Sequence, residues 1–227
     1  MAETPALIFD MDGTMINNMA YHERAWHQLL QKMGKNLSRS ALKPTLFGKN
    51  EEVIRRHFGD RFTIEEIKTL ASEKEAIYRN LYQPHLQLTH GLAEFLQWSS
   101  GEQIQMAIAT ASDLPNVNWV LDNTNARQYF KVIVTAEQTV RGKPDPEIFL
   151  KAAEGLQVKP EHCIVFEDVP KGAEAAFRAG MKTVMITSSY AAEELWKLPN
   201  VIDVIDHFGE RTPRDIIRKL YENGNRY

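Results

Sequence analysis

The sequence has little of what secreted, membrane-bound or nucleic-acid-binding proteins depend on. Among its 227 residues Cys163 is the only cysteine, which excludes an internal disulfide and a site built from several thiolates. No apolar run is long enough to span a bilayer, and the start of the sequence lacks the basic-then-apolar pattern of a secretory signal. The formal net charge is −3, and the sequence has no block of lysine or arginine. It therefore lacks the positively charged surface that binds nucleic acid or an anionic membrane. We therefore expect a cytoplasmic protein with no nucleic-acid or membrane partner. As a separate expectation, we take the protein to be a monomer, with a dimer as the alternative.

The composition is that of a globular protein with a sizeable core, because 43% of the residues are hydrophobic and 25% are charged. Short apolar segments alternate with helical patterns along most of the chain. Strands that alternate with helices form parallel sheets, so we predict an α/β fold: a Rossmann-like, mostly parallel sheet with helices on both faces. The expected strands are residues 6–9, 104–109, 132–134, 164–166, 183–186 and 201–205.

One long stretch after the first strand contains no strand pattern. Helices are predicted over residues 18–34, 51–58 and 64–82, and Thr63-Ile-Glu-Glu66 is a capping box that opens the last of them. We therefore expect an all-helical domain at residues 17–86, inserted into a core that is formed by residues 1–16 and 87–227.

Local signals also predict two helix boundaries in the core. A helix over residues 91–98 is expected to stop at Ser99-Ser100-Gly101. Asp145 is expected to be the N-cap of a helix that ends at Leu156, with Pro146 in the first position of this helix.

The chain is organised around its first strand. The apolar run from Ala6 to Phe9 leads directly into Asp10 and Asp12, which are one residue apart. Because consecutive side chains on a strand point to opposite faces, we expect both carboxylates on the same face. When two negative charges lie so near each other, they require a cation or a shared proton between them. The alternative is a turn at the strand end, in which Asp12 caps the next segment.

Polar groups follow three further expected strands. Thr110 follows the second strand, Lys143 lies in the loop after the third, and Glu167 and Asp168 end the fourth. In parallel sheets, ligands bind beyond the carboxyl ends of the strands. Converging carboxylates suit Mg²⁺, which prefers oxygen ligands, and a hydroxyl and an ammonium are the groups that a phosphoryl group needs around its oxygens.

Four motifs in this order resemble those of the haloacid dehalogenase superfamily, in the branch of β-phosphoglucomutase and many sugar-phosphate phosphatases. They are Phe9-Asp-Met-Asp-Gly-Thr14, Ala109-Thr-Ala-Ser112, Gly142-Lys143-Pro144 and Val165-Phe-Glu-Asp168, the last followed by Gly172. The similarity covers nearly the whole chain and includes the helical insert, which resembles that branch's cap domain. It implies a phosphoryl-transfer enzyme with Mg²⁺ as its cofactor and a small phosphorylated metabolite as its substrate.

The resemblance also implies a role for each matched residue. Asp10 would be the nucleophile that is transiently phosphorylated, and Asp12 would be the general acid and base. Thr110, Ala111 and Lys143 would hold the phosphoryl oxygens, and Lys143 would also screen Asp10 from the acidic cluster.

The implied metal ligands come from both acidic motifs. They are a carboxylate of Asp10, the backbone carbonyl of Asp12 and a carboxylate of Asp168. Glu167 would be either a further ligand or a partner that orients the ligands.

In the helical insert the resemblance aligns His22 with a histidine that helps position the acid/base aspartate, and Lys74 with a cap lysine that reaches the site. The alternatives are a helix-surface histidine and a solvated charge beside Glu73. Gly48 and Lys49 are further candidates for substrate contact, because they lie where mutases of this branch grip the sugar.

Two departures from the mutase pattern affect the predicted activity. Phe47 and Ile54 stand where β-phosphoglucomutases carry a lysine and, nearby, a serine that hold the sugar and its second phosphate. We therefore predict a Mg²⁺-dependent phosphatase of a small phosphorylated metabolite, with a sugar phosphate as the expected class.

A β-phosphoglucomutase-like phosphoryl transferase is the first alternative and an inorganic pyrophosphatase the second. A non-catalytic binding module is a third hypothesis, which the complete set of matched catalytic residues opposes.

Overall fold

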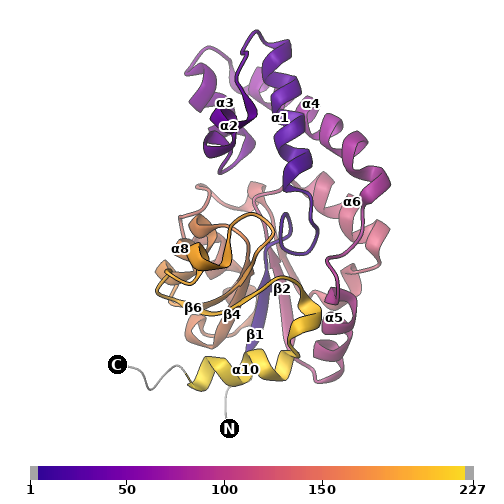
Figure 1. The fold of residues 1–227 in the computed structure, drawn as a ribbon, viewed down its shortest axis with the longest axis vertical. Coiled ribbons are helices and arrows are strands. Elements are labelled where there is room, and N and C mark those ends of the chain that lie inside the picture. Colours follow the sequence, from indigo (N-terminus) through magenta and orange to yellow (C-terminus); the bar gives the residue numbers. More distant parts are fainter. Residues whose placement is uncertain (1–4, 223–227) are drawn as a thin grey trace. The chain divides into compact units, whose positions relative to one another are not determined.

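The structure, a computed structural model, describes residues 5–222. These residues divide into two compact units, residues 5–17 with 87–222 and Asn18–Leu86 (Figure 1). We call them the core unit and the helical unit. The helical unit begins at Asn18, one residue later than predicted, and ends at Leu86 as predicted.

The core unit is built on a six-stranded sheet whose order is β3-β2-β1-β4-β5-β6. All neighbouring strands are parallel, as predicted, and β1 lies between β2 and β4 (Figure 1). The strands are β1 (Ala6–Phe9), β2 (Gln105–Ala109), β3 (Val132–Val134), β4 (Cys163–Glu167), β5 (Lys182–Ile186) and β6 (Val201–Ile205).

Helices cover both faces of this sheet. The α-helices are α5 (Leu92–Gly101), α6 (Leu114–Thr124), α7 (Glu147–Leu156), α8 (Pro170–Arg178), α9 (Ala192–Leu195) and α10 (Pro213–Glu222). Short 3₁₀ helices connect them at η3 (Arg127–Tyr129), η4 (Ala136–Gln138), η5 (Pro160–His162) and η6 (Phe208–Glu210).

The central strand is apolar because it is buried on both faces. Ala6 and Ile8 join a cluster with residues of α7 and α8, while Phe9 points to the other face. There its ring stacks on Phe166 at a centroid distance of 4.6 Å and meets Phe95 of α5 edge-on at 6.3 Å. Burying a side chain of this size stabilises the fold by about 2–3 kcal/mol. The predicted α/β fold class is confirmed.

The predicted end of the helix over residues 91–98 was wrong. Helix α5 continues through Gly101. Ser99 is fully buried, and its hydroxyl donates a hydrogen bond to the carbonyl of Phe95 at 2.8 Å, within the helix. A serine whose hydroxyl bonds the preceding turn does not terminate a helix.

Two other local predictions also needed correction. Helix α7 begins at Glu147 and has Pro146 as its N-cap residue, one position later than predicted, while Asp145 Oδ1 accepts a hydrogen bond from the Glu147 amide at 3.0 Å. Strand β1 ends at Phe9, so Asp10 and Asp12 lie in the turn beyond it. The alternation of side chains along a strand therefore does not apply to this pair.

The helical unit contains α1 (Met19–Lys32), α2 (Arg39–Leu42), α3 (Asn50–Phe58) and α4 (Ile64–Tyr82), with 3₁₀ turns η1 (Lys43–Thr45) and η2 (Gln83–His85). The predicted capping box is present, since the Thr63 amide donates to Glu66 Oε2 at 2.8 Å and the Glu66 amide to Thr63 Oγ1 at 3.3 Å. The short helix α2 was not predicted. The core of this unit consists of Trp26, Leu29, Leu30, Leu42, Val53, Ile54 and Ile67.

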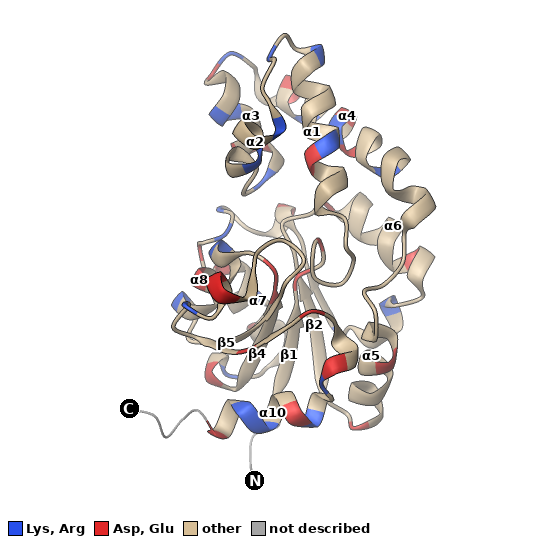
Figure 2. Ribbon diagram, viewed as in Figure 1, with Lys and Arg blue, Asp and Glu red and all other residues tan. Residues whose placement is uncertain are grey.

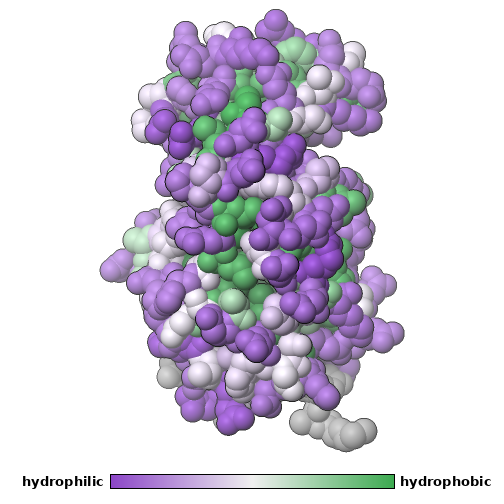
Figure 3. Space-filling view, turned by 90° about the vertical axis from the view of Figure 1, so that its right-hand side faces the viewer, coloured by the Kyte–Doolittle hydropathy of each residue, from purple (hydrophilic) through white to green (hydrophobic). Residues whose placement is uncertain are grey.

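The surface carries charges of both signs. Figure 2 shows acidic and basic positions side by side along α10, where Arg218 lies 3.6 Å from Asp215 and 3.3 Å from Glu222. The visible face in Figure 3 is mostly hydrophilic, with smaller apolar areas. In residues 5–222, no helix combines the length and the hydropathy that a membrane span requires.

Candidate active site

The predicted site lies in the core unit, beyond the carboxyl ends of β1 and β4. These strands are neighbours, but the chain leaves β1 for β2 on one side and returns to β4 on the other. Such a reversal of strand order is where open α/β sheets bind ligands. Asp10 follows β1 directly and its amide donates to the Phe166 carbonyl at 3.0 Å, which brings it beside the end of β4. Figure 2 shows acidic positions at this edge of the sheet.

Three carboxylates meet at this edge. Asp10, Glu167 and Asp168 each offer an oxygen within 4.8 Å of the others. All three residues are buried, with exposed fractions of 6%, 0% and 1%. We call them the acidic trio. Because buried like charges repel one another, the trio needs a compensating cation.

One such cation is Lys143, which reaches the trio from the loop after β3. Its Nζ lies 2.7 Å from Asp10 Oδ1 and 2.5 Å from Glu167 Oε1. Burial alone lowers the pKa of Lys143, but the Asp10 and Glu167 carboxylates outweigh this effect and hold the pKa above its usual range. Lys143 is therefore a fixed positive charge between two of the three carboxylates.

One ammonium does not balance three buried carboxylates. Burial raises the pKa of Asp10 to about 7, although the Lys143 ammonium opposes the increase. The pKa of Asp168 is raised well above its ordinary value, first by burial and then by repulsion from Glu167. The site thus favours either protons or an additional cation.

We expect the metal-free protein to lose stability as the pH rises from about 5 to about 8. The pKa of Asp10 is about 7 in the folded protein against 3.8 for an ordinary aspartate, so between these values the folded state holds the extra proton. The corresponding stability is present at low pH and is lost as the pH rises through about 7, an effect of roughly 2–4 kcal/mol. Denaturant unfolding with EDTA at pH 5, 6, 7 and 8 measures it. A flat or rising profile would contradict the expectation, and Asp10→Asn should remove much of the slope.

Glu167 is held by donors on both of its oxygens. While Oε1 accepts from Lys143, Oε2 accepts from the amides of Asp168 at 2.9 Å and Val169 at 3.0 Å. These contacts favour Glu167 as a residue that orients its neighbours rather than as a direct metal ligand.

Two glycines leave room for the acidic trio. A Cβ at Gly172 would lie 1.9 Å from Glu167 Oε1, and one at Gly13 would lie 2.1 Å from Asp168 Oδ2. Gly13 also has a φ of +81°, which disfavours any other residue. The backbone therefore approaches these carboxylates too closely for a larger side chain.

The carboxylate of Asp12 is not part of the acidic trio. Its Oδ2 accepts a hydrogen bond from Ser112 Oγ, and the Ser112 amide donates to Thr110 Oγ1 at 3.1 Å. The structure therefore brings Asp12 to the Thr110 loop, with Thr110 buried and Ala111 half-buried between the two polar residues. The contribution of Asp12 to metal binding through its carbonyl, and that of Ala111 to phosphate binding, stay predictions.

Sequence reasoning missed three hydroxyl residues at the site. Ser112 belongs to the second motif but was not assigned a role. Ser188 and Ser189, in the loop after β5, donate hydrogen bonds to the Gly13 carbonyl and to Asp168. The position of these two residues beyond a strand end was the signal that could have identified them.

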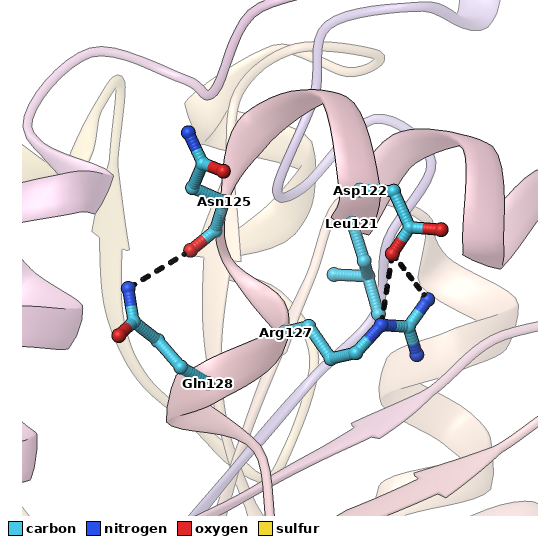
Figure 4. A pocket seen from close by; sticks show the side chains of 5 residues that line it. All are labelled: Leu121, Asp122, Asn125, Arg127 and Gln128. Carbon is cyan, nitrogen blue, oxygen red and sulfur yellow. Dashed lines mark hydrogen bonds and ion pairs between the residues drawn. The ribbon is translucent and has the colours of Figure 1, made fainter.

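A separate hollow of about 480 Å³ lies at the carboxyl end of α6 (Figure 4) and is lined by Leu121, Asp122, Asn125, Arg127 and Gln128. Its polar groups bond to one another: Arg127 Nε donates to Asp122 Oδ1 at 2.9 Å and Gln128 Nε2 to the Asn125 carbonyl at 3.2 Å. It contains none of the predicted site residues.

Comparison with known proteins decides the family. A family model described as haloacid dehalogenase-like hydrolase matches residues 7–186. The chain belongs to this family. The recognition made from the sequence is therefore confirmed.

Several relatives of this hydrolase are named phosphatases. It is 31% identical over 188 residues, covering 83% of this chain and 88% of the relative, to validoxylamine A 7'-phosphate phosphatase of Streptomyces hygroscopicus subsp. limoneus. It is 30% identical over 184 residues, 79% of this chain and 83% of the relative, to the phosphorylated carbohydrates phosphatase of Thermotoga maritima. The crystal structure of β-phosphoglucomutase from Clostridium difficile is also similar, with a TM-score of 0.84, 28% identity and coverage of 98% of this chain and 100% of that one. The hydrolase is thus an enzyme with phosphatases and phosphomutase-like structures among its relatives.

In the helical unit of the hydrolase, the structure brings His22 and Lys74 together. Lys74 Nζ lies 2.7 Å from His22 Nδ1 and donates to Glu75 Oε1 at 2.8 Å. Lys74 is only 2% exposed, so the alternative of a solvated charge beside Glu73 is wrong; Glu73 pairs instead with Lys32 at 2.5 Å. The roles of His22 and Lys74 toward the substrate stay predictions.

Gly48 and Lys49 have a local structural role in the same unit. Gly48 has a φ of +83°, and a Cβ there would lie 1.9 Å from Glu52 Oε2. The Lys49 amide donates to that same oxygen at 2.7 Å, which caps the start of α3. These contacts give the conformation of Gly48 and the main chain of Lys49 a structural role, and the contact of both residues with substrate stays a prediction.

Proposed function

We propose that this hydrolase is a Mg²⁺-dependent phosphatase that cleaves the phosphate monoester of a small metabolite, with sugar phosphates as the substrate class. The observation that carries the proposal is the position of Lys143 between Asp10 and Glu167, with Asp168 beside them. This set combines a nucleophile, a fixed positive charge and carboxylates for a cation. The names of the two phosphatase relatives support the substrate class.

The residues of the site fit Mg²⁺. The ion takes oxygen ligands, and the acidic trio offers three carboxylates whose burial and mutual repulsion favour a divalent cation. Asp10 and Asp168 are the carboxylates that would hold it, because Glu167 has donors on both oxygens. When bound, Mg²⁺ would offset the repulsion between the Asp10 carboxylate and an anionic phosphate ester.

Asp10 acts as the nucleophile in the first half of the reaction. Its carboxylate oxygen attacks phosphorus, and the bond between phosphorus and the leaving oxygen breaks as an aspartyl-phosphate forms. Lys143 keeps the Asp10 oxygen in place and presents positive charge to the phosphoryl group. Thr110, buried beside Ser112, offers a hydroxyl for a phosphoryl oxygen.

Asp12 transfers the protons. Its carboxylic acid protonates the leaving oxygen, and its carboxylate then accepts a proton from the water that attacks the aspartyl-phosphate. That attack releases inorganic phosphate and restores Asp10. The hydrogen bond from Ser112 to Asp12 Oδ2 holds the side chain in one orientation while it performs both steps.

Phosphomutase activity is the second candidate, favoured by the similarity to the β-phosphoglucomutase structure. Two residues of the helical unit oppose it. Ile54 is 1% exposed and packs in the core of this unit, and the Phe47 ring stacks under the Arg56 guanidinium at 3.8 Å. Neither side chain supplies a polar group for a second phosphate.

One set of assays separates the candidates. We expect phosphate release from several sugar phosphates in the presence of Mg²⁺, with little from inorganic pyrophosphate. Hexose 1-phosphate with a trace of hexose bisphosphate should yield free phosphate, whereas its conversion to hexose 6-phosphate would identify a mutase. Absence of Mg²⁺-dependent release from any monoester would contradict the proposal. The cytoplasmic location and the monomeric state remain predictions.

A further inference from the structure

The loop that follows β5 connects two parts of the site. It contains Ser188 and Ser189, directly after Thr187. Ser189 Oγ donates a hydrogen bond to Asp168 Oδ2. Ser188 Oγ donates to the carbonyl of Gly13 at 2.5 Å and lies 3.4 Å from the same Asp168 oxygen.

These contacts join segments that belong to different strands. Gly13 lies in the turn after β1, and Asp168 follows β4, whereas the serines follow β5, which pairs with β4 and β6 but not with β1. A single loop from a third strand therefore contacts both segments that the proposed metal site requires.

The loop itself is anchored away from the site. The Thr187 amide donates to the Ile205 carbonyl of β6 at 3.1 Å, and Thr187 Oγ1 donates to Asp206. This anchor lies at the end of β6, so the two serines are held from a strand that pairs with neither β1 nor β4.

We propose that Ser188 and Ser189 are positioning residues for the divalent cation of this site. Ser189 orients the Asp168 carboxylate by occupying one acceptor position of Oδ2, which leaves the remaining lone pairs for the cation. Ser188 holds the turn that contains Asp12 and Gly13 at a set distance from Asp168. This inference rests on the proposed function, since it assumes that Asp168 binds Mg²⁺.

The test is metal affinity, measured apart from catalysis. Mg²⁺ is titrated into the full-length protein, the midpoint of thermal unfolding is followed, and Mn²⁺ binding is monitored by electron paramagnetic resonance. We expect Ser189→Ala to raise the half-saturating Mg²⁺ concentration by about 10-fold to 100-fold, and Ser188→Ala to raise it by a smaller factor. Turnover at saturating Mg²⁺ should change much less than the affinity.

Matched variants keep the result interpretable. Tyr190→Phe removes a hydroxyl from an exposed side chain of the same loop, and it should leave the Mg²⁺ titration unchanged. Ser189→Thr keeps the hydroxyl and should restore most of the affinity. Ser189→Cys, which keeps the size but donates weakly, provides the same comparison should the alanine variant not fold.

The outcomes distinguish this inference from the proposed function. A wild-type protein with no Mg²⁺-dependent shift, equal to that of Asp168→Asn, would overturn the metal site and the inference together. A wild-type protein that responds to Mg²⁺ while Ser189→Ala and Ser189→Cys respond at the same concentration would overturn the inference alone. Equal loss of affinity in Tyr190→Phe would also overturn it, because a general effect on the loop and not the serine contacts would then be responsible.

Discussion

Replacing Asp10 with asparagine should reduce phosphate release from every monoester substrate by about 10⁴-fold or more. An amide keeps the shape of the side chain but cannot form the acyl-phosphate bond. Because the nucleophile is shared by all substrates in the proposed mechanism, the loss should appear in turnover at saturating substrate as well as in kcat/KM. A steady-state assay of released phosphate, with detection over five orders of magnitude, measures it.

The same variant should be more stable than the wild type in EDTA at pH 8. Burial raises the pKa of Asp10 to about 7, so at pH 8 the wild type holds a charge that the folded protein disfavours and that asparagine lacks. Asp113→Asn is a matched control, because Asp113 caps α6 through a hydrogen bond from the Asn116 amide at 3.1 Å and asparagine caps a helix equally well. This control should change neither activity nor stability. Substantial turnover by Asp10→Asn would exclude Asp10 as the nucleophile.

Replacing Lys143 with methionine should lower both activity and stability. Methionine fills most of the space of the lysine stem but leaves Asp10 and Glu167 without the ammonium that lies 2.7 Å and 2.5 Å from them. Removing one partner from a buried ion pair typically costs about 3–5 kcal/mol of the free energy of unfolding. We expect a loss of this order at pH 8 in EDTA, together with at least about a 10²-fold loss of turnover.

The pH dependence of the Lys143→Met variant separates this charge effect from lost packing. The Lys143 ammonium lowers the pKa of Asp10, so without it Asp10 should take up a proton at higher pH than in the wild type. The stability difference from wild type should therefore shrink as the pH falls from 8 to 5.5, because a protonated Asp10 no longer needs a cation. Lys131→Met, at an exposed lysine that bonds Gln105 at 2.8 Å, is the control and should show no such trend. A stability loss that is the same at both pH values would indicate packing alone.

Much of the fold followed from local patterns in the sequence. The strands at residues 6–9 and 183–186 were predictable because continuous short apolar runs between turn residues are typical of strands buried on both faces. The capping box at Thr63 and Glu66 located the start of α4 because both partners lie within four residues. The end of α5 was not predictable in this way, since the burial of Ser99 depends on tertiary packing around the helix, which the local sequence does not reveal.

For the candidate site, too, some features followed from the sequence and others only from the tertiary structure. The sequence by itself determined which residues are available for chemistry, because Asp10, Lys143 and Asp168 sit in motifs at the ends of strands whose parallel arrangement brings those ends to one edge. Only the tertiary structure decided which of them touch. It grouped Glu167 rather than the Asp12 carboxylate with Asp10, and it brought a serine loop from β5 onto Asp168. The physical reason is that hydrogen bonds and ion pairs form only within about 3–4 Å, and packing of segments far apart in the chain, not their order, sets distances on that scale.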